Sequence, residues 1–514
     1  MGSLVPWVAI ALSCYIVSLA LYRLLISPLA SIPGPRLAAL TFWYECYYDV
    51  FRPGQYVFKI KELHHKYAGP IIRITPDEVS ICDPDFVDTI YAPGPDHKRD
   101  KDFQKTKALG INTSIGGSIS HELHRKRREA LNPFFSQQRI SRLSPELADN
   151  ITQIEAVFSR ASSSSEVLNL SDIYYAFCND IVHKYCFGNN ANLLHDLSLA
   201  GTNRENVASV LRRTKFNLHF SWVRDMMQKL PPAIGISITP PGIRDIIAFR
   251  RSIRAQVASI LAGKRSSTET PSIFTHLRDS PDLPTSEKSP QRLEDEATLL
   301  IMAGTFSPML SLVVAHYHLI SRPEIMAKLR SELKSHPSAV TAAQLEQLPF
   351  LSAIVQEAHR LTFGLTGRIP RICPDETLVY NSQDVASGKT SRAHMIPPGT
   401  SVSASTLILH TNESIYPEPW NFDPERWLIT DNPVMLGRQR RAMMSFMRGS
   451  RGCIGKHLAN AEIAVAIAAM SRWNMHLDET TEEDVSFYHD YHVMCPKLGS
   501  KGVRAKVVGR AGEE

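Results

Sequence analysis

The chain has 514 residues, of which 43% are hydrophobic and 21% are charged, so extensive disorder is excluded. This length fits two or more domains, or one unusually large domain. The net charge of +6 is too small and too dispersed to indicate nucleic-acid binding. The eight cysteines form no CxxC pair, which argues against a disulfide scaffold or a zinc site and favours a reducing compartment.

The N-terminus predicts a membrane anchor. Residues Leu4 to Tyr22 carry no charge, and a helix needs about 20 such residues to cross the bilayer. A cleaved signal peptide is the alternative, but no basic segment precedes the run and no small-residue cleavage site follows it. Arg23 and Arg36 come after the run, so the positive-inside rule places the remainder in the cytosol. We expect a single-pass anchor over residues 1–27.

A proline-rich connector follows the anchor. Pro33, Gly34 and Pro35 stand together, and two prolines around a glycine end a helix and fix the direction of the chain. Residues 28–40 are therefore predicted to be a hinge, and residues 41–514 the catalytic body.

Helical periodicity dominates the body, most clearly over 294–320, 350–361 and 459–473. Strand-like alternation is confined to short stretches, at 71–74, at 79–81 and around 377–405. The predicted fold class is mainly α with small β-sheets. The polar stretches Ser159 to Glu166 and Lys264 to Arg292 are predicted to be surface loops.

No internal repeat, Walker-type loop or dinucleotide-binding GxGxxG occurs in the sequence. A reducing cofactor would therefore have to arrive on another protein.

A cysteine in a glycine-rich run carries the strongest chemical signal. Residues 446–455 read Phe-Met-Arg-Gly-Ser-Arg-Gly-Cys-Ile-Gly. Glycines let the backbone turn tightly and approach a planar group, and amides near the sulfur tune its donor strength. Cys453 precedes a predicted helix N-terminus, which favours the thiolate. A buried inert cysteine is the bland alternative.

This run resembles the haem-binding loop of the cytochrome P450 family. The resemblance implies that Cys453 is the axial thiolate ligand of a haem iron and that Arg451, Phe446 and Gly455 contact the haem. A thiolate ligand favours O–O cleavage, which implies oxygen activation.

Two further motifs match the family at the required spacing. Glu357 and Arg360 form an ExxR pair on one helical face, and Arg426, in a segment similar to the family's PERF motif, is expected to complete a charged cluster with them. Either motif alone would usually be a solvated surface pair.

The segment 121–136 resembles the helix that donates haem-propionate contacts, and its string is similar to that of fungal P450s of secondary metabolism, nearest to the trichodiene oxygenase type. His124 stands where the family usually has Trp, and Arg128 matches the family's Arg. Arg371 matches a third propionate contact. A packed or solvated histidine is the alternative for His124.

Six basic residues flank the thiolate side and could dock an acidic reductase, although a plain solvated face is nearly as well supported. They are Arg125, Lys126, Arg127, Arg438, Arg440 and Arg441.

The oxygen-activation helix departs from the family pattern. The family has Ala-Gly-x-acid-Thr-Thr, and here Thr305, Phe306, Ser307 and Pro308 follow Ala-Gly. Ser307 keeps a hydroxyl, Phe306 replaces the acid, and Pro308 should kink the helix. We take Ser307, Thr305 and Phe306 as the candidate catalytic positions. Protons could come through water with Ser307 or from a substrate hydroxyl, or the reaction could need no dioxygen cleavage.

The resemblance spans essentially the whole chain and implies one large haem domain behind a transmembrane helix in the endoplasmic reticulum. It implies hydroxylation or epoxidation of a lipophilic terpenoid, polyketide or alkaloid, with O₂ and electrons from NADPH through a separate P450 reductase. An isomerase, dehydratase or rearrangement catalyst, and a non-catalytic haem protein, are the alternatives. The substrate-facing candidates are 111–119, Ala303, Phe306, 363–366 and 491–494.

Overall fold

The computed structural model describes residues 4–94, 96–223, 226, 241–263, 272–335, 341–383, 390–428 and 431–512. The α-helices are α1 (Leu4–Leu21), α2 (Arg36–Leu40), α3 (Trp43–Cys46), α4 (Tyr56–Lys66), α5 (Val87–Ile90), α6 (Phe103–Lys107), α7 (His121–Leu131), α8 (Gln137–Ser141), α9 (Ser144–Ser164), α10 (Leu170–Phe187), α11 (Leu197–His219), α14 (Pro241–Leu261), α15 (Ile273–Asp279), α16 (Pro290–Ser321), α17 (Pro323–Lys334), α18 (Ala342–Leu345), α19 (Pro349–Thr362), α20 (Thr406–His410), α21 (Pro433–Ala442) and α22 (Lys456–Met470).

The strands are short and form four small sheets. They are β1 (Ile71–Arg73), β2 (Glu78–Ile81), β3 (Asp100–Lys101), β4 (Val167–Asn169), β5 (Arg371–Ile372), β6 (Leu378–Gln383), β7 (Thr390–Ile396), β8 (Ser401–Ser403), β9 (Trp473–Leu477), β10 (His489–Asp490), β11 (Met494–Cys495) and β12 (Arg504–Arg510). The mainly helical class with small sheets is therefore confirmed.

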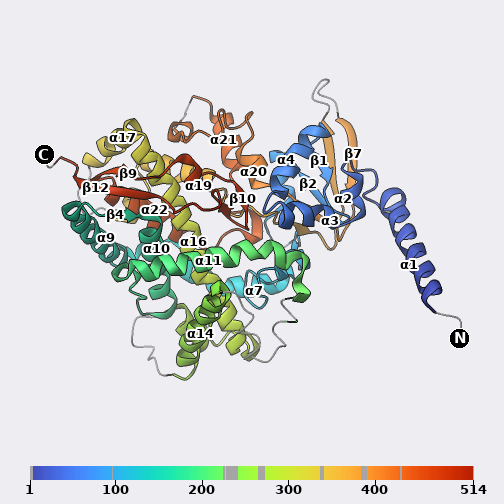
Figure 1. Cartoon of the computed structure of the whole chain (residues 1–514), viewed down its shortest axis with the longest axis horizontal. Coiled ribbons are helices and arrows are strands. Elements are labelled where there is room, and N and C mark those ends of the chain that lie inside the picture. The colour runs from blue at the N-terminus through green and yellow to red at the C-terminus, as the bar shows by residue number, and fades with distance from the viewer. Residues whose placement is uncertain are drawn as a thin grey trace.

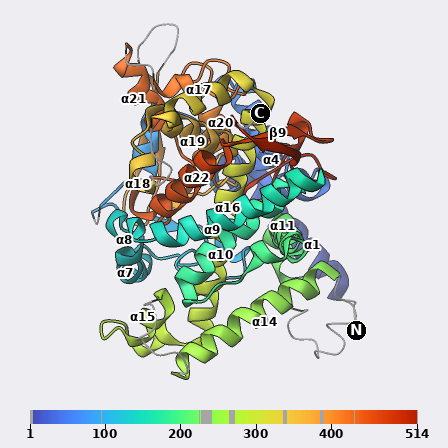
Figure 2. The same ribbon diagram turned by 90° about the vertical axis from the view of Figure 1, so that its left-hand side faces the viewer.

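Helix α16 runs through the centre of the helical part, with α10, α11, α19 and α22 around it (Figure 2). Because neighbours surround it, α16 is apolar on nearly all faces rather than along one stripe. A Cβ at Gly304 would fall 2.8 Å from the side chain of Val182 on α10. Glycine at this position therefore lets the two helices pack closely.

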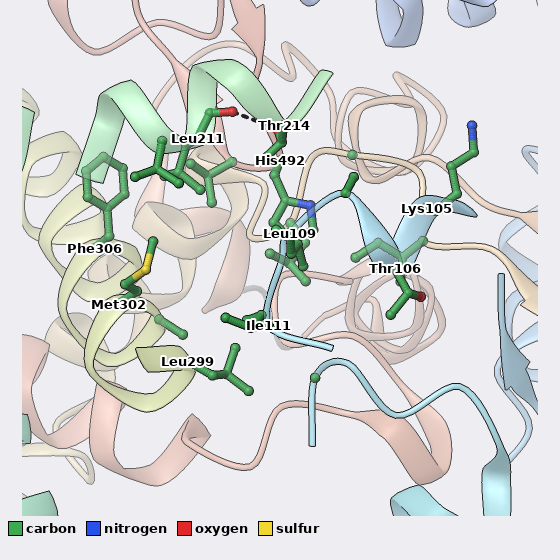
Figure 3. Close-up of a pocket in the computed structure, with 18 of the residues that line it drawn as sticks. Lys105, Thr106, Leu109, Ile111, Leu211, Thr214, Leu299, Met302, Phe306 and His492 are labelled. Atoms are coloured by element: carbon green, nitrogen blue, oxygen red, sulfur yellow. Dashed lines mark hydrogen bonds between the residues drawn. The ribbon is translucent and has the colours of Figure 1, made fainter. Parts of the chain in front are cut away.

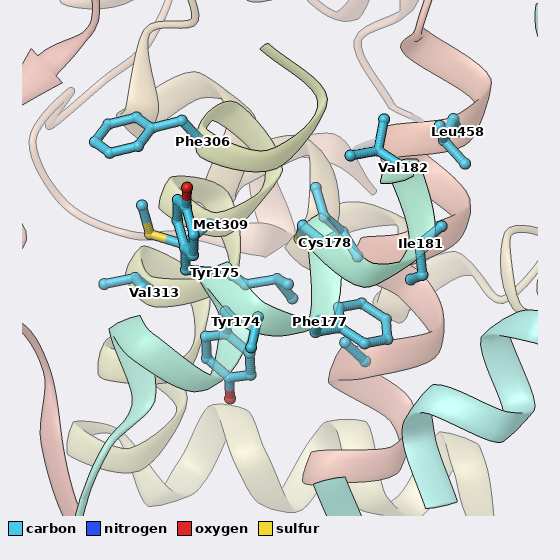
Figure 4. Close-up of a cluster of buried hydrophobic side chains, with 14 of the residues drawn as sticks. Tyr174, Tyr175, Phe177, Cys178, Ile181, Val182, Phe306, Met309, Val313 and Leu458 are labelled. Atoms are coloured by element: carbon cyan, nitrogen blue, oxygen red, sulfur yellow. The ribbon is translucent and has the colours of Figure 1, made fainter. Parts of the chain in front are cut away.

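The interior beside α16 is a continuous apolar cluster. Tyr174 of α10 lies beside Met309 of α16. Further along α10, Val182 lies beside Leu458 of α22 (Figure 4). Burying each large apolar side chain contributes about 1.5–3 kcal/mol. This packing fixes the helices that carry the candidate catalytic segment.

The largest sheet has five strands in the order β1-β2-β8-β5-β3 and lies at the end of the molecule from which α1 projects (Figure 1). Strands β1 and β2 pair antiparallel with Ile71 opposite Ile81, as the alternating pattern predicts. Strand β8 pairs parallel with β2, so a segment more than 300 residues downstream supplies the central strand of this sheet.

The N-terminal helix projects away from the body (Figure 1). The span Val5–Ile26 has a mean hydropathy of 2.0 and is not buried against the rest of the chain, so it is a candidate membrane span. Helix α16 is also long and apolar enough, but most of it is buried and it is a core helix. The connector packs on the body, where the Arg73 amide donates to the Pro33 carbonyl at 2.7 Å.

Most predicted elements are confirmed, with corrections at their ends. The predicted helices 294–320 and 350–361 lie within α16 and α19. The helix predicted over 459–473 is too long, because α22 ends at Met470 and Trp473 opens β9. Helix α16 is continuous through Pro308.

Both predicted polar loops are wrong in part. Residues 159–164 are the last turns of α9, because buried Phe158 and Ala161 hold this polar end of the helix against the core. In the second stretch, residues 264–271 lie outside the described residues. The remainder contains α15, capped by Ser272, and the first turn of α16, where Arg292 pairs with Glu287.

Candidate active site

The cysteine loop lies between α21 and α22 and is held by tight backbone contacts. The Cys453 amide donates to the Phe446 carbonyl at 2.8 Å. Gly449 has φ +71°, and a Cβ there would fall 1.7 Å from the Tyr91 carbonyl oxygen. The loop therefore requires glycine at this position both for its backbone conformation and for space.

Protein atoms surround the Cys453 thiol on all sides, but they do not pack against it, and its side chain keeps accessible surface. It therefore faces a space inside the molecule. Burial raises the pKa of the thiol, while a hydrogen bond from the Gly455 amide and the charges of Arg128 and Lys456 act in the opposite direction. Helix α22 begins at Lys456, which confirms the predicted helix N-terminus just after the cysteine. These groups all favour a bound thiolate.

Four cationic side chains gather beside this loop. Burial lowers the pKa of Arg451 to about 9, and repulsion from Arg371 adds to the effect. Lys101 of β3 has its pKa lowered by burial and then by Arg371 and Arg451, and burial also lowers the pKa of Arg128. Burial and the charges of all four cations lower the pKa of His124 to about 2, so its imidazole is neutral.

The four cations lack counter-charges. Across the described residues, no carboxylate lies within ion-pair distance of Lys101, Arg128, Arg371 or Arg451. Arg451 instead donates to three carbonyls, those of Arg99, Ser118 and Ile119, at 2.6–2.8 Å, and Arg128 donates to the Gly452 carbonyl. Buried like charges without counter-ions are costly. The two carboxylates of a haem fit this cluster because they would balance two of its four charges.

The ExxR motif forms the predicted charged cluster in the core. Glu357 and Arg360 are completely buried, and the guanidinium donates to the carboxylate at 2.7 and 2.9 Å. Arg426 donates to the same carboxylate at 3.1 Å, and Trp427 donates at 2.9 Å. Arg360 also donates to the His410 carbonyl. The cluster ties α19 to the segment that leads into the cysteine loop.

A cavity of about 360 Å³ lies beside the central part of α16. Leu299, Met302 and Phe306 line one end of it, and Lys105 and Thr106 lie at the other (Figure 3). The cavity is mostly apolar and suits a small lipophilic molecule.

The three candidate catalytic positions on α16 have different surroundings. Ser307 lines the cavity with an open surface, and Phe306 forms part of its wall. Thr305 is buried and accepts a hydrogen bond from Asn179 at 3.2 Å, on the side away from the cavity. Only Ser307 and Phe306 are therefore positioned to meet a substrate.

The other positions predicted to contact the substrate or the haem also differ in whether they line the cavity. Ile111, Leu365 and Val493 line the cavity. Phe363 does not, because its ring packs against Phe487 and His410. Phe446 contacts His359 edge-on with ring centroids 4.6 Å apart, on the α19 side of the cysteine loop.

The prediction that Arg127 belongs to a basic docking face is wrong. Arg127 is buried and forms hydrogen bonds with Glu287 and Ser118. It lies on the inner face of α7, where a partner protein cannot reach it. Arg125 is exposed but pairs with Glu122 and Glu129 of its own helix.

Sequence reasoning missed Lys101 and most of the cavity wall. Lys101 sits on a two-residue strand with no local pattern, and its place beside Arg371 depends on the pairing of β3 with β5. The α11 wall, including Leu211, is a run of ordinary helical residues. The excess of basic over acidic residues in the segment 97–101 is the one feature of the sequence that points to Lys101.

Comparison with known proteins agrees with this site. The cytochrome P450 family model matches residues 34–500. Cytochrome P450 monooxygenase tpcC of Cochliobolus heterostrophus is 36% identical, over 96% of this chain and 94% of the relative. Tryptophan 6-hydroxylase fscE of Fusarium equiseti is 34% identical over 96% and 95%, and N-acetyltryptophan 6-hydroxylase ivoC of Emericella nidulans is 33% identical over 95% and 94%.

A mainly helical body, a cysteine in a glycine-rich turn and an apolar cavity beside a central helix are the features expected of an oxygen-activating haem-thiolate enzyme. The chain belongs to the cytochrome P450 family and is a monooxygenase, similar to enzymes of fungal secondary metabolism. Members of this family bind haem through a cysteine thiolate and use O₂ with electrons from a redox partner.

Proposed function

We propose that this chain hydroxylates or epoxidises a lipophilic terpenoid, polyketide or alkaloid in fungal secondary metabolism. Residues 1–27 would anchor it in the endoplasmic reticulum membrane, residues 28–40 form the hinge, and residues 41–514 form a cytosolic catalytic domain. The observation that carries the proposal is Cys453, held in a glycine turn and facing an enclosed space beside four cations that form no ion pair among the described residues.

Each site residue has a distinct part in this proposal. Cys453 is the iron ligand, and bound haem supplies the activation of O₂. Arg128, Arg371 and Arg451, joined by Lys101, hold the propionates, while neutral His124 packs beside them. The Gly455 amide hydrogen-bonds the sulfur, and the Phe446 carbonyl accepts from the Cys453 amide. The site residues thus bind and orient the cofactor, and the cavity wall excludes water.

Exposed aromatic side chains support the proposed attachment to a membrane. Trp43 of α3 and Trp222 after α11 are 63% and 61% exposed, and Phe220 stacks obliquely near Trp43 with ring centroids 6.1 Å apart. Aromatic residues of this kind are enriched at membrane interfaces. Helix α3, which carries Trp43, contacts α2, and α2 contacts residues Tyr22–Ile26 at the end of the anchor segment.

One assay separates the proposed function from its alternatives. Microsomes containing the chain would be supplied with candidate substrates, with and without NADPH and P450 reductase. We expect a product heavier by one oxygen atom that depends on both. An isomerase, which the loss of the acid at Phe306 also allows, would give a product of unchanged mass without NADPH. Intact haem with no product from any substrate would contradict both.

Replacing Phe306 with Asp tests the source of protons. If water held by Ser307 relays protons and limits turnover, an added acid should raise the fraction of NADPH consumed that yields product, by about 2- to 5-fold. The measurement is product formed per NADPH oxidised, with Phe306→Leu as the control for lost wall volume. An unchanged or lower ratio in Phe306→Asp would count against the water relay.

A further inference from the structure

His492 is the cavity residue whose conformation is most constrained. It lies in the turn between β10 and β11 and has φ +76°, a left-handed conformation that costs a residue other than glycine about 1–3 kcal/mol. Its side chain projects into the cavity (Figure 3). Such strain persists only where surrounding contacts enforce it.

Asp490 enforces the turn. Its carboxylate accepts hydrogen bonds from the His492 amide at 3.0 Å, from the Thr366 hydroxyl at 2.8 Å and from Lys215 of α11 at 2.6 Å. The His492 carbonyl in turn accepts from the Thr366 amide at 3.0 Å. The backbone of His492 is therefore fixed at both its amide and its carbonyl.

Lys215, the cation of the network that holds the turn, remains charged although it is buried. Burial alone would lower the pKa of Lys215, but Asp49 and Asp490 outweigh this and raise it. Lys215 lies 2.6 Å from Asp490 and 3.3 Å from Asp49. This ion pair joins α11, the β10–β11 turn and the N-terminal segment around one wall of the cavity.

The imidazole itself is neutral and unsatisfied. Burial lowers the pKa of His492 to about 4; Asp490 opposes this, while Lys215 and Lys101 reinforce it. A neutral imidazole offers one donor and one acceptor. Within the described ranges, neither ring nitrogen has a hydrogen-bond partner. Both ring nitrogens keep accessible surface, so a ligand in the cavity can reach them.

The end of the cavity formed by α16 is mainly apolar, and its accessible polar side chain is the Ser307 hydroxyl beside the candidate oxygen-activation segment. Leu299, Met302 and Phe306 line that end, and His492 lies between it and Lys105 (Figure 3). A pure hydrocarbon bound here would leave the imidazole unsatisfied. A ligand with an oxygen remote from its apolar end would satisfy it.

We propose that His492 hydrogen-bonds a hydroxyl or carbonyl oxygen of the substrate, so that the preferred substrate is already oxygenated when this enzyme oxidises it. The inference deepens the proposed function and rests on it. The reaction that supplies the substrate must then either introduce a hydroxyl or carbonyl oxygen into it or retain one that its precursor already carries. His492 would therefore determine substrate specificity by hydrogen-bonding the substrate rather than by taking part in the oxidation.

The test uses ligand-induced spectral titration of the haem-loaded chain with matched pairs. The pairs are farnesol and farnesene, a phenolic anthraquinone and its deoxy analogue, and N-acetyltryptophan and 3-ethylindole. We expect the oxygenated member of at least one pair to bind about tenfold more tightly, as one hydrogen bond allows. His492→Phe should abolish this preference, and His492→Asn, which tolerates the same φ and keeps hydrogen-bonding groups, should retain part of it.

His489→Phe is the matched control, because His489 lies on the same hairpin but contacts the Pro53 carbonyl and does not line the cavity. Haem content checks that each variant folds. No preference in any pair, or a preference that survives His492→Phe, would overturn the inference while leaving monooxygenation intact. A preference dependent on His492 in a chain that forms no oxygenated product would instead overturn the proposed function alone.

Discussion

Replacing Cys453 with alanine is expected to reduce product formation at least about 1000-fold, because the proposed chemistry depends on iron held by that thiolate. The Cys453 side chain faces the enclosed space, and the backbone of its loop is fixed by Gly449 and Phe446 independently of the sulfur. The variant should therefore fold. Product formed with reductase and NADPH is the measurement.

Cys495→Ala is the control for that variant. Cys495 is half-buried on β11 and does not line the cavity, so its removal should leave turnover within about twofold. Full activity in Cys453→Ala would show that another group holds the iron.

Replacing Glu357 with alanine is expected to destabilise the fold by about 3–5 kcal/mol. The carboxylate is completely buried and accepts hydrogen bonds from Arg360, Arg426 and Trp427. Without it, two buried guanidinium groups keep their charges and lose their partner. Chemical denaturation of the wild-type and variant chains measures the difference in free energy of unfolding.

Glu425→Ala provides the matched control, because Glu425 is exposed and pairs with Lys328 at the surface. Exposed pairs of this kind contribute at most about 1 kcal/mol. Equal losses of stability in Glu357→Ala and Glu425→Ala would show that the ExxR cluster does not stabilise the fold.

The sequence predicts those parts of the site that local pattern encodes. The cysteine loop, the ExxR helix and the short β1–β2 hairpin each depend on residues a few positions apart, so spacing alone identifies them. The serines at the end of α9 favour a loop in the sequence because they are polar. The segment is helical because Phe158 and Ala161 are buried against the core.

The remainder depends on contacts between distant segments. Lys101 joins the cation cluster only through the pairing of β3 with β5. Thr305 and Ser307 are two residues apart on α16, and only the packing of α10 shows that Thr305 faces Asn179 while Ser307 faces the cavity. His492 carries no motif, and its role emerges from Asp490, Thr366 and Lys215, which meet in space alone.

The most direct test of haem-thiolate ligation is the carbon-monoxide difference spectrum of the reduced, haem-loaded chain. Wild type should show the band at the wavelength specific to a thiolate ligand, and Cys453→Ala should lack it while Cys495→Ala retains it. A thiolate band that persists in Cys453→Ala, or a wild-type spectrum typical of histidine ligation, would contradict the assignment of Cys453 as the iron ligand.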